Sequence, residues 1–233
     1  MTERRDILDG TNRFNWIKTR GLLYTCNAGW IDLGHLNPRN ERPEVGAANL
    51  WRQVIAEGAP ITDPWCHLPS TRTGYYPART RPAKCDTDPL FRFPDGKPGY
   101  VVRYRQDAYS AGLGRRVGRE ARYIVKQGLT LQQKKSVALA IFSEISLRFE
   151  KLQLLSQLAL VTKSGFSQED LVSNLIGFYI GIGEISQYEA IKLCHPVSDR
   201  TAFAIWDAEG AVGAIQNKNW QWKPKLAERT EVD

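Results

Sequence analysis

The chain has 233 residues, of which 42% are hydrophobic and 24% charged, and this excludes collagen-like, coiled-coil and wholly disordered proteins. Its 32 Lys and Arg residues outnumber its 25 Asp and Glu residues, and the net charge of +7 favours an anionic partner without identifying one. The length suits one domain, which we place at residues 1–228, with a tail at 229–233.

No targeting or membrane-spanning segment is evident in the sequence. Residues 1–9 (MTERRDILD) lack the apolar stretch of a secretory signal, so we expect the chain to be cytoplasmic as made. No run of 18 apolar residues predicts a membrane span. Cys26, Cys66, Cys85 and Cys194 are too far apart for a zinc finger, and Cys66 and Cys85 are either reduced or joined in a disulfide. No nucleic-acid-binding module is recognisable.

Strands and helices are predicted in the N-terminal half by local patterns. An apolar run predicts a strand at 21–25, and helical periodicity predicts a helix at 44–57. Residues 59–98 are rich in Pro and lack periodicity, which predicts a long irregular excursion. Two further strands, at 100–105 and 119–125, are expected on either side of a Gly- and Arg-rich connection.

The C-terminal half is predicted to be helical. Capping-box pairs, Ser or Thr followed three residues later by an acid or Gln, precede three apolar-periodic segments. They predict helices at about 131–161, 168–182 and 187–194, and a further helix is expected at 199–208. The fold class is therefore helix-rich α+β, with a small antiparallel sheet element packed on a long central helix and a helical C-terminal half.

An Asp and a His occur close together in the segment GWIDLGH, residues 29–35. Asp32 and His35 share one face if this segment is helical and diverge if it is a strand. On one face, Asp32 could orient His35 as a general base, or both could bind a metal ion. The structural alternative is that Asp32 caps the backbone near a packed imidazole ring.

The long predicted helix carries a polar stripe on one face, made of Ser143, Ser146, Glu150, Gln153 and Gln157. One carboxyl group among neutral side chains is expected of a helix that lines a cavity, and also of a solvated helix face. Glu150 is therefore a candidate catalytic acid or metal ligand.

A third motif, SQEDLVSNLIG, begins the next predicted helix. Glu169 and Asp170 fall in its first turn, where acids satisfy free N–H groups, but both are also candidates for binding substrate. Asn174 shares the face of Asp170 within an apolar helix, so we expect it to have a partner in the interior. Gly177 and Gly181 indicate close packing of this helix in the core.

Three segments, YTCNAGWIDLGHL, FSEISLRFEKLQ and GFSQEDLVSNLIGFYIG, follow in this order. Together they resemble a bacterial family of domains of unknown function with GxIDxxH and EDLxSN motifs, many of whose members are predicted envelope lipoproteins. The chain departs from the family pattern at Asn37, where an Arg is usual, and at Phe149, where a His usually precedes the helix Glu. The resemblance covers residues 20–220 and implies that the motif residues lie together, but it implies no reaction.

From these residues we expect a hydrolase that acts on a bacterial envelope polymer, such as peptidoglycan or a related anionic glycan or glycopeptide. His35 would be a general base or metal ligand oriented by Asp32, and Glu150 the acid or a further ligand. Asn174 would position the substrate or an oxyanion. A divalent metal ion is left open, because a single His is unusual for zinc.

Two variants of this prediction stay open. Without a leader, the chain could be an antibacterial effector exported by a leaderless secretion machine, acting in the periplasm and paired with an immunity or secretion partner. The alternative from a different class is a non-catalytic, envelope-associated binding or interaction module, in which the polar cluster only stabilises the core.

Overall fold

The computed structural model describes residues 3–11, 21–36, 44–58, 91–110, 115–153 and 168–210. Within these ranges six helices and two antiparallel sheets of two strands form a helix-rich α+β fold, as predicted. The elements are α1 (Arg4–Thr11), β1 (Leu22–Thr25), β2 (Gly29–Asp32), α2 (Ala47–Ala56), β3 (Gly99–Ser110), β4 (Arg115–Lys126), α3 (Leu131–Gln153), α5 (Gln168–Gly181), α6 (Gln187–Cys194) and α7 (Asp199–Glu209).

Several predictions concern residues outside these ranges. They are most of the predicted excursion at 59–98, with Cys66 and Cys85, and the predicted helical residues 154–161. The single domain at 1–228 and the tail at 229–233 stay predictions. Among the described residues, no helix is both long and apolar enough to cross a membrane.

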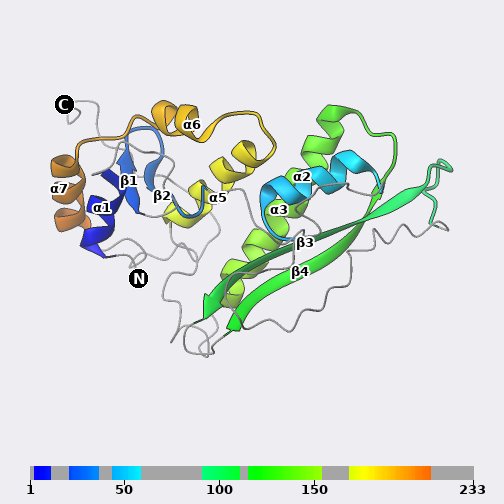
Figure 1. Ribbon diagram of the computed structural model, residues 1–233, viewed down its shortest axis with the longest axis horizontal. Helices are drawn as coiled ribbons and strands as arrows, with labels where there is room; N and C mark the ends of the chain where they lie inside the picture. The colour runs from blue at the N-terminus through cyan, green and yellow to red at the C-terminus, as the bar shows by residue number, and fades with distance from the viewer. Residues whose placement is uncertain are drawn as a thin grey trace, which may run out of the picture.

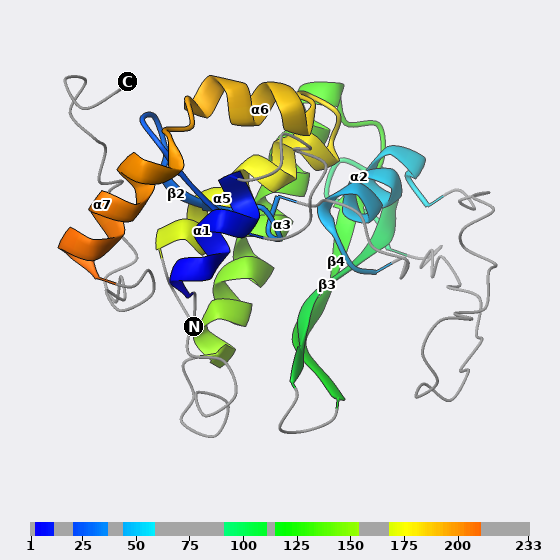
Figure 2. The same cartoon turned by 60° about the vertical axis from the view of Figure 1, so that its left-hand side comes forward.

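The elements form two groups that meet at α5 (Figure 1). One group contains α2, α3 and the β3–β4 hairpin, and the other contains α1, α7 and the β1–β2 hairpin. Helix α5 contacts β2 of the second group and α2 and α3 of the first, and α6 follows it. Figure 2 shows the same order after a turn of 60°. The two groups are therefore joined largely through α5, which contacts both.

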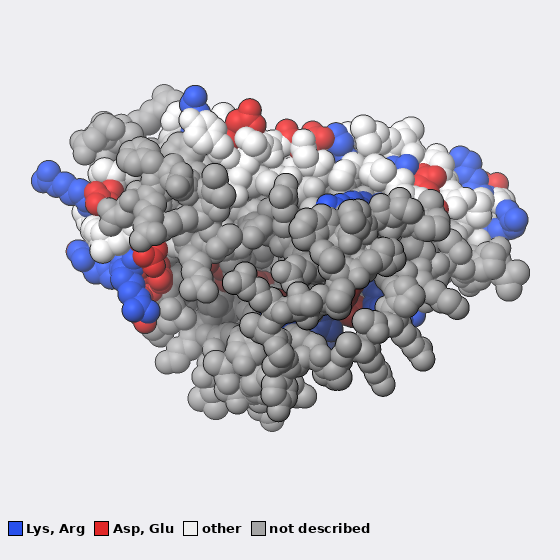
Figure 3. Space-filling view, in the orientation of Figure 1, with Lys and Arg blue, Asp and Glu red and all other residues white. Residues whose placement is uncertain are grey.

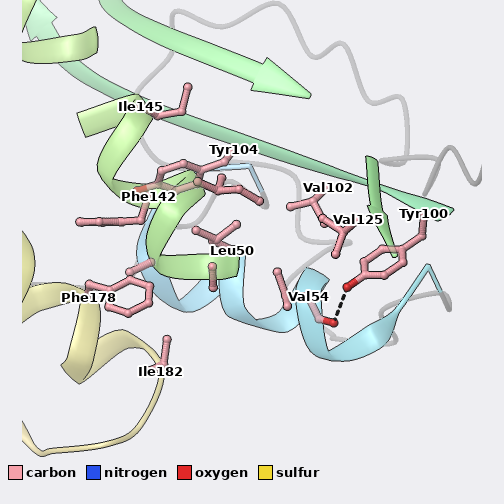
Figure 4. Packing of buried hydrophobic residues seen from close by; sticks show 13 residues of the cluster. Leu50, Val54, Tyr100, Val102, Tyr104, Val125, Phe142, Ile145, Phe178 and Ile182 are labelled. Atoms are coloured by element: carbon pink, nitrogen blue, oxygen red, sulfur yellow. Dashed lines mark hydrogen bonds between the residues drawn. The ribbon is translucent and has the colours of Figure 1, made fainter. Parts of the chain in front are cut away.

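A hydrophobic cluster, here called the hairpin core, joins β3, β4, α2, α3 and α5 (Figure 4). Leu50 and Ile145 are fully buried in it, as is the ring of Tyr100. The Tyr100 hydroxyl donates a hydrogen bond of 2.9 Å to the Val54 carbonyl, so the polar end of this buried side chain is satisfied. Burial of these side chains supplies the main driving force for this half of the fold.

The β3–β4 hairpin is longer than predicted. Its register runs from Gly99 opposite Lys126 to Ser110 opposite Arg115, so the predicted connection at 112–118 contributes residues to the strand β4. Gly118 makes this extension sterically feasible, because a Cβ atom there would lie 2.2 Å from the Gln106 carbonyl oxygen. The sequence reading took this glycine for a turn signal.

A second cluster joins α1, β1, β2 and α7, and its centre is aromatic. The ring of Trp30 packs edge-to-face against Tyr24 and Trp206, with centroid separations of 5.1 and 5.8 Å. The Arg4 guanidinium lies 4.1 Å from the ring centroid of Phe203 and ties α1 to α7. Helix α1 was not predicted, because its eight residues have no capping signal and few apolar positions.

The predicted capping boxes are confirmed at two helices, whereas the helix predicted at 44–57 begins only at Ala47. At α3, the Gln133 N–H donates to Thr130 Oγ1 at 3.3 Å, and the Thr130 N–H donates to Gln133 Oε1 at 2.9 Å. Ser186 and Glu189 form the same reciprocal pair at α6. Ser167, the predicted cap of α5, lies outside the described residues.

Candidate functional site

Strand β2 ends at Asp32, and a tight turn follows it. The Gly34 N–H donates to Asp32 Oδ1 at 2.6 Å, and the His35 N–H donates to the Asp32 carbonyl at 3.1 Å. The segment is therefore neither helical nor extended at His35. The turn reverses the chain within three residues and directs the imidazole toward α5.

Helix α5 presents Asp170, Ser173, Asn174 and Gly177 on one face, at the spacing i, i+3, i+4, i+7. The Ser173 hydroxyl accepts a hydrogen bond of 2.8 Å from the backbone N–H of Asp32. Gly177 lets the turn approach, because a Cβ atom there would lie 2.6 Å from the His35 carbonyl oxygen. Gly181 does the same toward α2, which confirms that the two glycines serve close packing.

Both ring nitrogens of His35 face oxygen atoms of α5. Nδ1 lies 3.2 Å from Asn174 Oδ1, and Nε2 lies 3.3 Å from Asp170 Oδ1. Asn174 therefore has the interior partner that its position predicted. Asp170 and Asn174 contact the ring directly, in the orienting role that the sequence analysis assigned to Asp32.

The surroundings of His35 favour its charged form. Burial acts to lower the pKa of His35, but the carboxyl groups of Asp170, Asp32 and Glu150 and the hydrogen bond that the ring donates to Asn174 outweigh burial and raise it to about 9. With the ring nitrogens both protonated, each donates to the oxygen that faces it. In the metal-free protein, His35 is thus a cation at neutral pH.

A cavity of about 310 Å³ opens beside His35. His35 and Asn174 line it from the junction, and Phe149 and Glu150 line it from α3. The Glu150 side chain is fully buried, with 0% exposure, so it belongs to the cavity wall rather than to a solvated helix face. The cavity-lining interpretation of the polar stripe is confirmed at this residue.

Strand β3 supplies a further wall that the sequence analysis missed. Gln106 and Asp107 line the cavity, and Gln106 Nε2 donates to Ser146 Oγ on α3 at 2.8 Å. The Asp107 carboxylate is fully buried and pairs with Arg105 and Arg116 at 2.8 and 3.1 Å. The one available signal was the change from alternating apolar residues to the polar sequence QDA within the strand.

One predicted substrate-binding residue is not placed to touch a substrate here. Glu169 is 1% exposed, and it belongs neither to the cavity wall nor to the cluster at His35. Neighbouring helix positions point about 100° apart, so Glu169 and Asp170 cannot share the face toward His35. Asp170 does reach His35 from the first turn of α5.

Three residues are arranged so that they could hold a metal ion. Asp32, His35 and Asp170 each offer one ligand atom, and these atoms all lie within 4.8 Å of one another. The sequence analysis had instead grouped Asp32 and His35 with Glu150. Glu150 faces the same cavity but is not a member of this set.

No protein-family model, curated protein or solved structure matches the chain. The family resemblance described above therefore stays a prediction. The case for a function depends on the geometry of the junction and the cavity.

Proposed function

We propose that the protein is a hydrolase and that its active site is the cavity between His35 and Glu150. The observation that carries the proposal is that these two side chains, from distant parts of the chain, line one cavity. A fully buried carboxyl group and an imidazole held by a carboxylate are the residue types that acid–base hydrolysis requires.

In the proposed reaction, water attacks an acyl or glycosyl carbon of the substrate. A carbon–oxygen bond forms, the bond to the leaving group breaks, and the water proton passes by way of Glu150 to the leaving group. For an acyl carbon, the charged His35 stabilises the negative charge that develops on the carbonyl oxygen. The sequence predicts His35 as a general base or metal ligand and Glu150 as the acid or a further ligand, and the raised pKa of His35 disfavours its role as the base.

Asp170 and Asn174 act as positioning residues in this proposal. They hold both ring nitrogens of His35 and fix the plane of the imidazole. Asn174 also lines the cavity, so its amide NH₂ is available to a substrate oxygen.

The proposed substrate is an envelope polymer such as peptidoglycan or a related anionic glycan or glycopeptide. The net charge of +7 supports an anionic substrate, and the family resemblance supports the envelope. A cavity of about 310 Å³ suits one unit of such a polymer. On the face drawn in Figure 3, the visible basic side chains are interspersed with acidic ones. The support for an anionic substrate therefore comes from the net charge of the chain and not from a basic patch on this face.

Incubation of the purified protein with isolated sacculi, followed by mass spectrometry of released fragments, tests the proposal. Wild-type protein should release fragments, and Glu150→Gln should release none while keeping its melting temperature. Glu144→Gln is the matched control, because Glu144 lies on the same helix but pairs with Arg148 at the surface. Equal release by both variants would rule out Glu150 as a catalytic residue.

The antibacterial-effector form of the proposal has its own test. Expression with a periplasmic signal should inhibit growth, and expression without one should not. Equal harmlessness in both compartments would contradict it.

A second candidate function is a non-catalytic binding or interaction module. It is favoured by the way the polar groups satisfy one another, since His35 and the backbone of Asp32 are both bonded to α5. In that case His35→Ala lowers the melting temperature, and the wild-type protein releases nothing from sacculi. Fragment release by wild-type protein would reject this candidate.

A further inference from the structure

We infer that Asp32, His35 and Asp170 bind one divalent transition-metal cation, Mn²⁺ or Zn²⁺, at the junction of β2 and α5. Binding of the ion rests on the geometry of the three side chains. Its use in catalysis rests on the proposed function, and the two parts are tested separately below.

The distances within the cluster suit a single ion. Nε2 of His35 and Oδ1 of Asp170 are 3.3 Å apart, and two ligands of one tetrahedral ion at about 2.1 Å are separated by about 3.4 Å. All three ligand atoms lie within 4.8 Å of one another. Ligands of one tetrahedral ion lie about 3.4 Å apart, so a pair of atoms at the 4.8 Å limit would need to close by about 1.4 Å.

The hydrogen bond at the other ring nitrogen orients His35 for this role. The oxygen of the Asn174 amide only accepts, so Nδ1 carries a hydrogen and donates to it. A metal ion that takes the place of the Nε2 proton would meet the ring nitrogen and the Asp170 oxygen already facing each other at 3.3 Å.

Asp32 is held in place as a ligand by bonds that leave one carboxylate oxygen available. Its backbone N–H donates to Ser173, and its Oδ1 accepts from the Gly34 N–H. Oδ2 therefore remains for a metal ion. Metal-binding carboxylates are commonly anchored in this way through their second oxygen.

The donor set and the cavity indicate the class of metal and its role. One imidazole nitrogen with two carboxylate oxygens suits Mn²⁺ or Zn²⁺, whereas Mg²⁺ and Ca²⁺ prefer oxygen ligands alone. Three protein ligands leave a coordination position open, as in catalytic zinc sites. His35 also lines the cavity that Glu150 lines, so a metal held by these residues would be close to that cavity and could activate a water there.

Calorimetry with MnCl₂ on the full chain, after treatment with chelator and dialysis, tests the binding. We expect one Mn²⁺ per chain, and the Mn²⁺ EPR signal of the free ion should decrease in parallel. Asp170→Asn should weaken binding by more than about tenfold, because it removes a direct ligand. Asp199→Asn, the same substitution at an exposed position on α7, should leave binding unchanged.

Asp32→Asn keeps the inference testable if Asp170→Asn fails to fold. The amide oxygen of Asn can still accept from Gly34, so the turn survives while the ligand charge is lost. The inference is wrong if wild-type protein shows no binding up to about 1 mM Mn²⁺. It is equally wrong if neither substitution weakens binding.

Zn²⁺ needs an additional control because thiols compete for it. Cys26 and Cys194 are both free. The Cys26 N–H donates to the His195 carbonyl at 2.9 Å, so the backbone at Cys26 lies beside the segment that contains Cys194 and His195. Zn²⁺ titrations are therefore repeated in a Cys26→Ser, Cys194→Ser variant. If the double Ser variant still binds Zn²⁺ and loses it when Asp170→Asn is added, the inferred site is supported. If the double Ser variant itself no longer binds Zn²⁺, the thiols are the binding site.

Digestion of sacculi with and without EDTA separates the inference from the proposed function. Metal binding without any fragment release leaves the inference standing and contradicts the hydrolase. If the protein binds neither Mn²⁺ nor Zn²⁺ and releases the same fragments with and without EDTA, the hydrolase is supported and the inference is overturned.

Discussion

Helix α5 is held on two sides by different kinds of contact. Toward α2 and α3, Phe178 and Ile182 enter the hairpin core, where apolar side chains pack together. Toward β2, the same helix presents Asp170, Ser173 and Asn174, which meet the turn at His35 through polar contacts beside an apolar cluster that includes Ile31, Leu33 and Val172. The hairpin core depends mainly on buried area, whereas the junction combines apolar packing with contacts that depend on the placement of individual polar atoms.

This difference separates stability from site geometry. Apolar packing has no preferred direction, so a loss in the hairpin core weakens the fold without reorienting a particular group. A hydrogen bond or ion pair works only within narrow limits of distance and angle. We therefore expect substitutions in the hairpin core to change mainly the free energy of unfolding, and substitutions at the junction to change mainly metal binding.

The largest effect on stability is expected from Leu50→Ala. Leu50 is fully buried in the hairpin core, so its truncation leaves a cavity and should lower the free energy of unfolding by about 2–5 kcal/mol. Urea denaturation measures the loss. Mn²⁺ affinity of the folded variant should match wild type, and a tenfold weaker affinity would show that the two regions are coupled.

The comparison is sharpest at the two glycines of α5. A Cβ atom on Gly177 meets the His35 carbonyl at 2.6 Å, whereas one on Gly181 meets the Ala47 side chain at 2.7 Å. Gly177→Ala and Gly181→Ala should each cost about 1–3 kcal/mol through overpacking. Calorimetry should show weaker Mn²⁺ binding for Gly177→Ala alone, and equal affinities in both variants would contradict a junction set by this close approach.

Ser173→Ala tests the backbone tie between β2 and α5. Ser173 is fully buried, and its loss leaves the Asp32 N–H without this acceptor, at a cost of about 1–3 kcal/mol. Ser136→Ala is the control, because Ser136 is exposed on α3 and should change stability by less than about 0.5 kcal/mol. Indistinguishable denaturation midpoints for the two variants would argue against this tie.

The charge on His35 should give the stability of chelator-treated protein a pH dependence. Its pKa is raised from 6.5 to about 9, so its protonated form stabilises the fold fully below pH 6.5, and this stability is lost as the pH rises through about 9. Denaturation midpoints of wild type and His35→Gln should therefore differ more at pH 6.5 than at pH 10. A constant difference would mean that the carboxyl groups do not favour the charged imidazole.

The elements could be predicted from sequence because their signals are local. The capping boxes at Thr130 and Ser186 and the apolar periodicity of α2 and α5 each lie within one segment. Helix α1 could not be predicted, because its burial depends on α7 at the other end of the described chain. The extension of β4 through Gly118 likewise depends on the partner strand.

The residues at the junction could be predicted from sequence, but their pairing could not. The motif with Asp32 and His35 and the polar face of α5 were each visible, and Asn174 was correctly expected to have an interior partner. Which carboxylate meets the imidazole depends on how β2 docks on α5, and no local pattern encodes that. Gln106 and Asp107 were missed because a strand that lines a cavity looks in sequence like one that faces solvent.

The hydrogen bond between β2 and α5 can form only late in synthesis of the chain. Asp32 and Ser173 are 141 residues apart, so at about 5–20 residues per second the ribosome makes the partner of this turn roughly 7–28 s after the turn itself. A hairpin of two short strands is marginal on its own. A nascent chain that ends before α5 therefore contains His35 and Glu150 but lacks Asp170, Ser173 and Asn174, so the candidate site is complete only when α5 has been made.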